Sequence, residues 1–378
     1  MKKILIVADS MVVGGIEKSI CSLIHAIDKK QYNIDLLLVE KKGAFLDEVR
    51  GEVRILPQLY QKSIRQFWYR ALLSLRCRST SSMMQKEKYH SLYYHKIFGA
   101  PDTHYDVAIG CHNGKTQAYV AEKVNADIKI IQNHCNYADS VAFNWVYPEI
   151  DREVYKKVNY VVTVSESARE ALVSYFPEMK DKIKVIHNIV NKELIQYKAM
   201  EYEPYENRNR IKIVTVCRIG REKGLDMIVP IATVLKKKGY DFVWYIVGEG
   251  DYKEELQREI SNFALNDIVK LEGEKANPYP YMYRCDIYVQ PSYTESWGLT
   301  VQEALILGKY VVATNLPAFC EQIISGKNGI IAEISVESLS EKICEVIEKG
   351  YYQNNCCKEK ESNNEVEKYY ELFKVIKE

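Results

Sequence analysis

The sequence lacks several features that would assign a function at once. Lys and Arg (52) almost equal Asp and Glu (51), so the chain has no excess of positive charge with which to coat nucleic acid. No apolar run approaches the roughly 18 residues that a membrane span requires. The ten cysteines form no C-x-x-C pair and no Cys/His group at zinc spacing. We therefore expect no nucleic-acid partner, no transmembrane helix and no zinc site.

Composition and length indicate a folded protein of more than one domain. The chain has 378 residues, of which 47% are hydrophobic and 27% charged. At about 150 residues per domain, this length predicts two domains. The apolar run at the start, Ile4–Ala8, is too short for the core of a signal peptide. The cysteines also show no pattern typical of disulfides. Together, the short apolar run and the scattered cysteines favour a cytoplasmic location.

Charge is distributed unevenly along the chain. Residues 1–100 contain 17 basic and 9 acidic side chains, a net charge of +8. Most of this excess lies in residues 60–99, where eight Lys and Arg and one Glu alternate with aromatic and Leu residues. Such a segment can rest on an anionic membrane surface, or it can be a solvated helical insertion whose aromatic residues pack on the domain. The composition alone favours neither interpretation.

Alternation of short apolar runs with helical patterns predicts an α/β fold. A buried strand at the start, a loop with Gly14-Gly15, a helix over 16–27 and a strand over 34–39 form a βαβ unit. A second series begins at residue 211, after a polar interval at 196–210 that we interpret as a linker. The prediction is two doubly wound, Rossmann-like domains, 1–195 and 211–378, facing each other across a cleft. This division leaves open whether the C-terminal helix packs on the second domain or back on the first.

The most informative stretch is YVQPSYTESWGLTVQEALILG, residues 288–308. A strand ends here, a loop contains Glu295, and a helix that begins near Leu299 contains Glu303. The start of a helix leaves backbone N–H groups and a positive dipole for an anion, so this loop is a candidate phosphate site. The residues that would form it are Ser296, Trp297, Gly298, Leu299 and Thr300. Alternatively, both acids are solvated or stabilise the helix, and Trp297 is a packing residue.

A second cluster follows the strand predicted over 211–217. Arg218 offers a bidentate fork to phosphate and Lys223 a point charge, in the setting CRIGREKG. Gly14-Gly15 is the corresponding loop of the first domain. Because the G-x-G-x-x-G fingerprint of dinucleotide-binding proteins is missing there, a nucleotide-linked oxidoreductase or epimerase is disfavoured.

With these residues the chain resembles the retaining glycosyltransferases of family 4 (glycosyl transferases group 1), which have the GT-B fold. Glu295 and Glu303 are similar to the E-x7-E motif of this family, and Arg218 with Lys223 to its phosphate-binding pair. Gly248-Glu249-Gly250 is similar to its G-x-G turn. The resemblance implies that Glu303 binds the ribose of a nucleotide and that Glu295 binds the transferred sugar. Arg218 and Lys223 would neutralise the departing diphosphate.

In the first domain, the resemblance implies two further site elements. Gly14 and Gly15 would let the backbone approach the diphosphate and the acceptor. His134, in IIQNHCNY, corresponds to a histidine that faces the donor sugar, although His112 and His187 are rivals and His134 could also be a core residue.

The function implied is transfer of a sugar from a UDP- or GDP-linked donor to an acceptor hydroxyl. The acceptor expected is a saccharide, a lipid-linked saccharide or a glycolipid of cell-surface polysaccharide synthesis, handled at the inner face of the membrane. No D-x-D motif is present, so we expect no metal and no other cofactor. A non-catalytic, nucleotide-sugar-binding partner of a glycosyltransferase complex remains the alternative.

Overall fold

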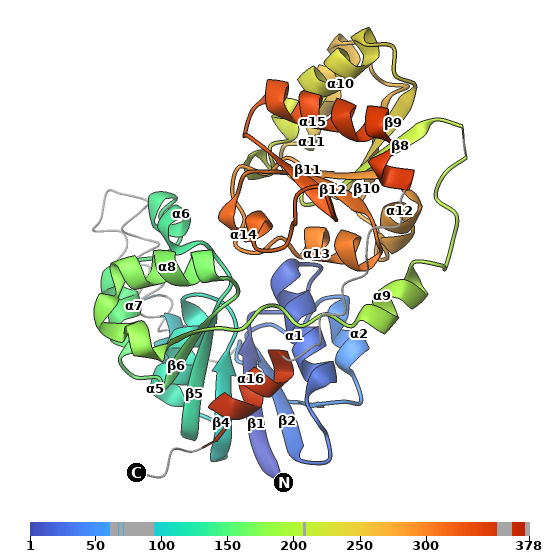
Figure 1. Ribbon diagram of the computed structural model, residues 1–378. Helices are drawn as coiled ribbons and strands as arrows, with labels where there is room; N and C mark the ends of the chain where they lie inside the picture. The colour runs from blue at the N-terminus through green and yellow to red at the C-terminus, as the bar shows by residue number, and fades with distance from the viewer. Residues whose placement is uncertain (61–66, 68–70, 72–93, 207–208, 354–364, 375–378) are drawn as a thin grey trace. The chain divides into compact units, whose positions relative to one another are not determined.

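The computed structural model describes residues 1–60, 67, 71, 94–206, 209–353 and 365–374 (Figure 1). The chain divides into two compact units. The first unit contains Met1–Val190 and Asn363–Glu378, and the second contains Asn191–Ser362. The sequence-based division placed the end of the first domain at residue 195, whereas the first unit ends at Val190.

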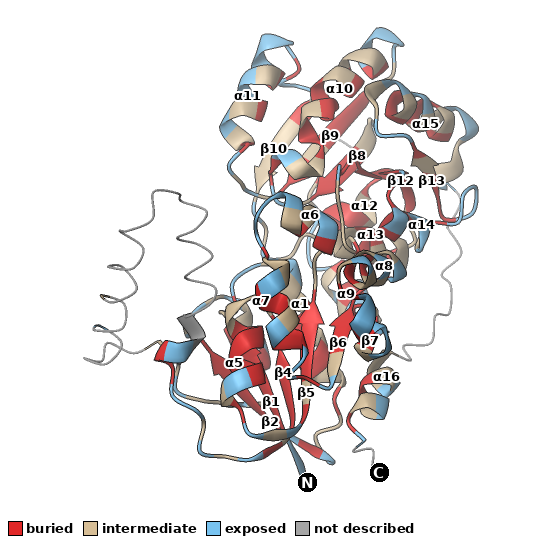
Figure 2. Ribbon diagram, turned by 90° about the vertical axis from the view of Figure 1, so that its left-hand side faces the viewer, coloured by how far each residue is buried: buried red, intermediate tan, exposed pale blue. Residues whose placement is uncertain are grey.

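The first unit is built on a parallel sheet. In the described residues its strand order is β3-β2-β1-β4-β5-β6-β7, and every neighbouring pair is parallel. These strands are β1 (Lys2–Ala8), β2 (Tyr32–Leu38), β3 (Arg54–Ile55), β4 (Tyr105–Gly110), β5 (Ala126–Asn133), β6 (Tyr160–Thr163) and β7 (Ile183–Val185). The central strands are buried on both faces (Figure 2), which explains why they are continuous apolar runs in the sequence.

Helices cover both faces of this first sheet. One face packs against α1 and α16, through residues such as Ile24 and Tyr369, and the other packs against α5 and α8, through residues such as Tyr119 and Leu172. The helices are α1 (Gly15–Ala26), α2 (Phe45–Val49), α5 (Lys115–Lys123), α6 (Tyr137–Ala142), α7 (Pro148–Tyr155), α8 (Glu166–Tyr175) and α16 (Glu365–Leu372), with 3-10 turns η1 (Tyr94–Ile97) and η2 (Pro177–Lys182). Ser165 caps α8, because its hydroxyl accepts a hydrogen bond from the Ala168 N–H at 3.0 Å.

The second unit repeats this plan. Its sheet has the order β10-β9-β8-β11-β12-β13 in the described residues, again with parallel neighbours. The strands are β8 (Ile211–Val216), β9 (Phe242–Val247), β10 (Val269–Gly273), β11 (Ile287–Gln290), β12 (Tyr310–Thr314) and β13 (Gly329–Ala332). From β8, strands β9 and β10 are added on one side, whereas β11, β12 and β13 are added on the other side. The strand order therefore reverses between the neighbours β8 and β11. In open α/β sheets this switch point is where ligands bind.

Helices of the second unit also lie on both faces of its sheet. The main core joins α10, α11 and α15 to one face, while α12 and α13 contact β8, β11 and β12. The helices are α9 (Lys192–Lys198), α10 (Ile228–Lys237), α11 (Lys253–Asn262), α12 (Tyr279–Arg284), α13 (Leu299–Ile306), α14 (Pro317–Cys320) and α15 (Val336–Lys349), with 3-10 turns η3 (Arg221–Lys223), η4 (Leu225–Met227) and η5 (Tyr351–Gln353). The predicted pair of doubly wound α/β domains is therefore confirmed.

The interval 196–210, interpreted as a linker, differs in the structure. Its first residues complete α9, and Tyr205 is buried in the second unit. The Tyr205 ring lies 4.7 Å from the ring of Tyr245 and 5.6 Å from that of Tyr281, and its hydroxyl donates to the Tyr281 carbonyl at 2.6 Å. Two neighbours add further contacts: the Tyr202 hydroxyl donates to the Asn277 carbonyl at 2.6 Å, and Glu203 accepts from Arg284 at 3.1 Å. The polar composition of the interval hid these contacts.

The first regular helix after β8 begins only after two 3-10 turns. Gly224 has a left-handed φ of +66°, which an α-helix does not contain, and it joins the two 3-10 turns η3 and η4. The regular helix α10 therefore begins only at Ile228.

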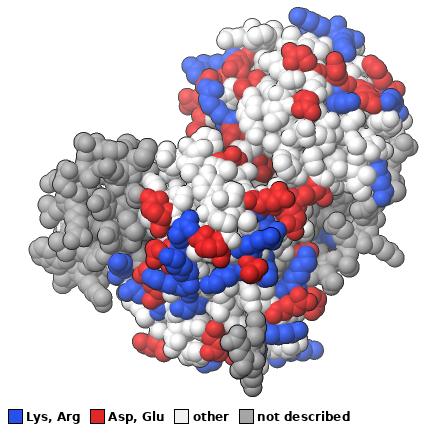
Figure 3. Space-filling view, turned by 60° about the vertical axis from the view of Figure 1, so that its left-hand side comes forward, with Lys and Arg blue, Asp and Glu red and all other residues white. Residues whose placement is uncertain are grey.

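Residues 60–99 are mostly outside the described part of the chain, so the basic segment stays a prediction from sequence. On the described surface of the first unit, Lys and Arg side chains are interspersed with Asp and Glu (Figure 3). Lys156 pairs with Glu153 and Lys157 with Glu122, each at 2.7 Å. None of the helices in the described ranges combines the length and apolar character needed to cross a bilayer.

Candidate functional site

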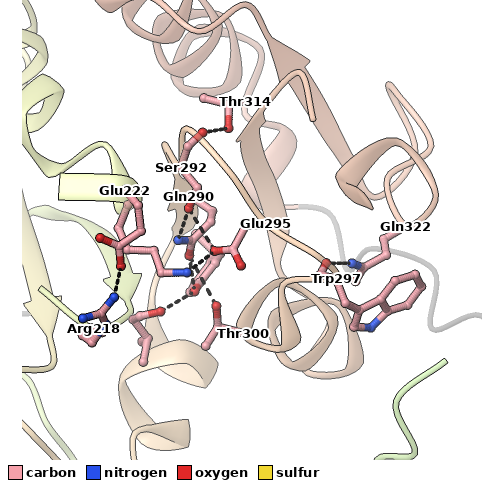
Figure 4. A network of polar contacts seen from close by, with 12 residues as sticks. Arg218, Glu222, Gln290, Ser292, Glu295, Trp297, Thr300, Thr314 and Gln322 are labelled. Atoms are coloured by element: carbon pink, nitrogen blue, oxygen red, sulfur yellow. Dashed lines mark hydrogen bonds and ion pairs between the residues drawn. The ribbon is translucent and has the colours of Figure 1, made fainter. Parts of the chain in front are cut away.

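The candidate donor site lies at the carboxyl ends of β8 and β11, the neighbouring strands at the switch point of the second sheet. Arg218 and Lys223 follow β8, and Glu295 follows β11 (Figure 4). Parallel strands deliver both loops to the same edge of the sheet. The structure therefore brings together two clusters that are separated by 72 residues in the sequence.

Lys223 and Glu295 form a direct ion pair. The Lys223 Nζ lies 2.7 Å from the Glu295 Oε1, and their side chains are only 19% and 13% exposed. Burial opposes the charge of Lys223, but the carboxylate outweighs it and leaves the lysine pKa above its ordinary value. Lys223 is therefore a fixed positive charge at neutral pH.

A chain of hydrogen bonds holds the loop after β11. The Ser292 hydroxyl donates to the Glu295 Oε1 at 3.0 Å, and the Gln290 side-chain amide donates to Ser292 at 3.0 Å. Thr300 donates to the Gln290 Oε1 at 3.4 Å, and Thr314 donates to the Ser292 carbonyl at 2.6 Å (Figure 4). Since Gln290, Ser292 and Thr314 are completely buried, this chain fixes the carboxylate of Glu295. Sequence reasoning missed Gln290, a polar residue at the end of an otherwise apolar strand.

Arg218 has a different partner from Lys223. Its guanidinium donates to the Glu222 Oε1 at 2.6 Å, four residues along the same loop, and its side chain is 61% exposed. The backbone N–H of Tyr293 donates a hydrogen bond to the backbone carbonyl of Glu222 at 2.9 Å. This bond joins the loop after β8 to the loop after β11. Glu222 was not singled out from the sequence, where it appears as one more charged residue of a charged loop.

Glycine residues allow the loops to approach one another closely. A side chain at Gly224 would collide with the backbone carbonyl of Pro291, at the turn that follows β11. Side chains at Gly248 and Gly250 would collide with the carbonyls of Cys217 and Ile219, next to Arg218. The G-x-G turn thus has a structural reason in this protein: it lets the loop after β9 lie directly on the loop after β8.

We predict that Gly224→Ala lowers the free energy of unfolding more than the same substitution at a left-handed glycine elsewhere. Gly239 is a matched control, because it has a φ of +86° but nothing within 4 Å of a new Cβ. Gly239→Ala should cost about 1–2 kcal/mol of unfolding free energy from backbone strain alone. Gly224→Ala should add roughly 1–3 kcal/mol from the clash with Pro291, and should weaken binding of nucleoside diphosphate. Denaturant unfolding of the two variants measures this; equal losses would contradict it.

The start of α13 is shaped by Gly298, which has a left-handed φ of +82°. A Cβ there would also meet the ring of Phe319 at 2.5 Å. The glycine is therefore required by the fold, in addition to any need for a phosphate to approach. Trp297 is 7% exposed, and its indole N–H donates to Gln302 at 2.8 Å, so its ring packs within the second unit.

Glu303 lies inside α13 and is completely buried. Its Oε1 accepts a hydrogen bond from the Tyr279 hydroxyl of α12 at 3.3 Å. The charge of Glu303 acts on Tyr288, whose pKa is well above its ordinary value mainly because the phenol is buried. The second acid of the E-x7-E pair thus has its own surroundings, separate from the Lys223–Glu295 ion pair.

The first unit contains the remaining predicted residues. Gly14 precedes α1, which begins at Gly15, and a Cβ on Gly14 would collide with the carboxylate of Glu17. Glu17 lies 3.4 Å from the His112 Nε2. His134 follows β5, and its Nε2 lies 3.2 Å from the Gln132 Oε1.

The surroundings of His134 keep its ring neutral. Burial, with a smaller contribution from the charge of His112, lowers the pKa of His134 to about 3. At neutral pH its imidazole is therefore a hydrogen-bonding group without charge.

In the described ranges, no three His, Cys, Asp or Glu side chains come close enough together to hold a metal ion. The cysteines placed by the structure are Cys21, Cys111, Cys135, Cys217, Cys285, Cys320 and Cys344, and all have free thiols. The expected independence from metal stays a prediction.

Comparison with known proteins gives matches over most of the chain. The profile of "Glycosyltransferase Family 4" matches residues 13–194, and that of "Glycosyl transferases group 1" matches residues 201–363. An uncharacterised glycosyltransferase of Methanocaldococcus jannaschii is 30% identical over 209 residues, 53% of this chain and 52% of that protein. The N-acetylgalactosamine-N,N'-diacetylbacillosaminyl-diphospho-undecaprenol 4-alpha-N-acetylgalactosaminyltransferase of Campylobacter jejuni is 26% identical over 186 residues, 49% of each chain. These alignments span about half the length of the curated relatives.

Among solved structures, HepE of Anabaena in complex with UDP and glucose is similar in fold. Its TM-score is 0.70 at 17% identity, with 100% of this chain and 96% of that chain covered. Two Rossmann-like units, one with paired cations and carboxylates at its switch point, define a GT-B type of α/β protein. The chain belongs to the glycosyl transferases group 1.

Proposed function

We propose that the protein is a retaining glycosyltransferase that moves a sugar from a nucleoside diphosphate sugar to an acceptor hydroxyl. The observation that carries this proposal is the Lys223–Glu295 ion pair at the switch point of the second sheet, 2.7 Å long. It combines a fixed cation, suited to phosphate, with a carboxylate suited to sugar hydroxyls. Membership of the family supports the same assignment.

In this proposal the second unit stabilises the departing diphosphate. When the bond from the anomeric carbon to the phosphate oxygen breaks, negative charge develops on the diphosphate. Lys223 and the backbone N–H groups at the start of α13 supply positive charge there without moving, and Glu295 holds Lys223 in place. Arg218, which pairs with Glu222, is exposed enough to turn its guanidinium toward the diphosphate and add a second cation.

Glu295 and His134 are the groups we assign to the transferred sugar. Lys223 and Ser292 both bind the Oε1 of Glu295, so we assign its Oε2 to a sugar hydroxyl. Glu295 stands close to the reacting carbon in this assignment. The neutral His134 would take a second hydroxyl.

Retention of configuration requires that the acceptor attack from the face that the diphosphate leaves. The acceptor oxygen forms its bond to the anomeric carbon while the bond to the phosphate oxygen breaks. The proton of the acceptor passes to that phosphate oxygen, so no side-chain nucleophile takes part. No metal enters this scheme, because the cations named above carry the positive charge.

We propose a lipid-linked saccharide or a glycolipid as the acceptor, in the synthesis of cell-surface polysaccharide. The name of the Campylobacter relative specifies a sugar carried on diphospho-undecaprenol, which supports this class. The basic and aromatic residues 60–99 would contact an anionic membrane at its inner face, a proposal that depends on their composition.

The experiment that tests the proposed function measures binding and turnover separately. Isothermal titration should give affinities for UDP or GDP more than about tenfold higher than for NAD, in buffer with or without EDTA. A donor labelled in its sugar should then release that sugar to water or to an acceptor. Binding without any release would identify a non-catalytic partner instead, and preference for NAD would point to an oxidoreductase. Loss of binding in EDTA would contradict the metal-free scheme.

A further inference from the structure

The C-terminal helix α16 is fixed to the first unit by its aromatic residues. The ring of Tyr370 stacks on that of Tyr32, with centroids 5.5 Å apart and planes 7° apart. The Tyr370 hydroxyl accepts a hydrogen bond from the backbone N–H of Asp28 at 2.8 Å, and Phe373, directly after the helix, is 1% exposed. The helix therefore has a defined position against the first unit, and Tyr369, a residue of the same helix, is buried in the core beneath it.

Tyr369 is connected to His134 through a single side chain. The amide nitrogen of Gln132 donates to the Tyr369 hydroxyl at 2.5 Å, and the amide oxygen of Gln132 lies 3.2 Å from the His134 Nε2. Gln132 and Tyr369 are 2% and 4% exposed, so these bonds are shielded from bulk water.

The orientation of this amide is linked to the tautomer of the histidine. In the structure the amide N–H of Gln132 is directed to Tyr369, and its oxygen, which can only accept, faces the imidazole. The proton of the neutral ring must then be on Nε2, which leaves Nδ1 as the acceptor atom of His134.

The same three side chains line a small cavity in the first unit. Ser19, His187 and Asn188 also line it, and the Ser19 hydroxyl donates to the Asn188 Oδ1 at 2.8 Å. Glu365, also from α16, accepts the backbone N–H of His187 at 2.8 Å. Two residues of the C-terminal helix thus reach the polar cluster around His134.

We propose that Tyr369 is a positioning residue for sugar transfer, which acts through Gln132 to fix the orientation and the tautomer of His134. The proposal rests on the proposed function, in which His134 faces the donor sugar. A hydroxyl of the transferred sugar would then donate a hydrogen bond to Nδ1. A nucleoside diphosphate sugar that has no hydrogen-bond donor at that position would be a poor substrate.

The test compares two tyrosines of the same helix. Tyr369→Phe keeps the ring and removes the hydroxyl that orients Gln132. Tyr370→Phe is the matched control, because it also removes a hydroxyl bonded to the first unit but leaves Gln132 unchanged. Nitrogen-15 NMR of the full chain labelled at histidine reports the tautomer, with His134→Gln used to assign the signal.

We expect wild type and Tyr370→Phe to show His134 protonated on Nε2. In Tyr369→Phe the amide of Gln132 can turn its N–H to the ring, so the Nδ1-protonated form should appear. The kcat should fall on the order of tenfold, with the donor KM within about twofold. An unchanged tautomer and kcat would overturn the proposal, as would equal effects of both variants, because these would reflect helix docking alone.

A second variant and the choice of readout keep the result interpretable. If Tyr369→Phe does not fold, Gln132→Met removes the amide at similar volume and should likewise abolish the preference for Nε2. The tautomer is read without any substrate. Should the wild type turn over no nucleoside diphosphate sugar, the proposed function fails while the NMR result still decides whether Tyr369 positions His134.

Discussion

Replacing Lys223 by Met should lower kcat by roughly 10²–10³-fold, the loss that follows removal of one preorganised charge from a developing anion. The expected loss is large because Lys223 is held in place by Glu295 and is only 19% exposed. Water therefore cannot replace the ammonium fully, as it would at an exposed site. Steady-state kinetics with a saturating donor measures the change.

Loss of Lys223 also leaves the Glu295 carboxylate, which is 13% exposed, without its cation. The single variant should therefore unfold at a lower temperature. The double variant Lys223→Met with Glu295→Gln removes both charges and should recover most of that stability without recovering kcat. Recovery of both together would mean that Lys223 acts only by stabilising the loop.

Arg221 provides a matched control for this experiment. It belongs to the same 3-10 turn, η3, but pairs with Glu255 at the surface, where the two side chains are 66% and 43% exposed. Because exposed ion pairs contribute little to stability, Arg221→Met should change the unfolding temperature only slightly and leave kcat nearly unchanged. A loss of kcat equal to that of Lys223→Met would show that the total charge of the loop matters, and not the position of one ammonium.

The comparison of sequence with structure shows which information is local. The buried strands β1 and β8 were predicted from apolar runs, since a strand covered on both faces needs no polar residue. The E-x7-E and R-x4-K spacings located the candidate site for the same reason: each is confined to one loop or to a loop and the helix after it. Short helices such as α6 and α14 have too few turns to show a period, and were not predicted.

Contacts between distant segments could not be predicted. The bond from Gln132 to Tyr369 joins residues 237 positions apart, and nothing in the charged C-terminal tail marks Tyr369 among 29 tyrosines. The pairing of Arg218 with Glu222 depends on the turn of a loop whose form is set by Gly224 against Pro291. Such details arise from tertiary packing, to which hydrophobic periodicity is insensitive.

Replacing each acid of the E-x7-E pair by Gln should affect different quantities, nucleotide affinity for one and kcat for the other. Glu303→Gln should weaken the binding of nucleoside diphosphate by about ten- to a hundredfold, the value of one charged hydrogen bond to a ribose hydroxyl. Glu295→Gln should leave that affinity within about threefold and lower kcat instead, because its carboxylate is assigned to the sugar. Isothermal titration and turnover of the same preparations measure both quantities.

Burial of Glu303 makes a control necessary, since its carboxylate accepts the Tyr279 hydroxyl and the side chain has no exposed surface. Tyr279→Phe removes this contact but keeps the carboxylate. If Glu303 recognises ribose, Tyr279→Phe should retain more nucleotide affinity than Glu303→Gln at equal thermal stability. If both variants lose stability and affinity in parallel, Glu303 acts as a buried structural acid. Equal losses of affinity and kcat in Glu295→Gln and Glu303→Gln would contradict the division of roles between ribose and sugar.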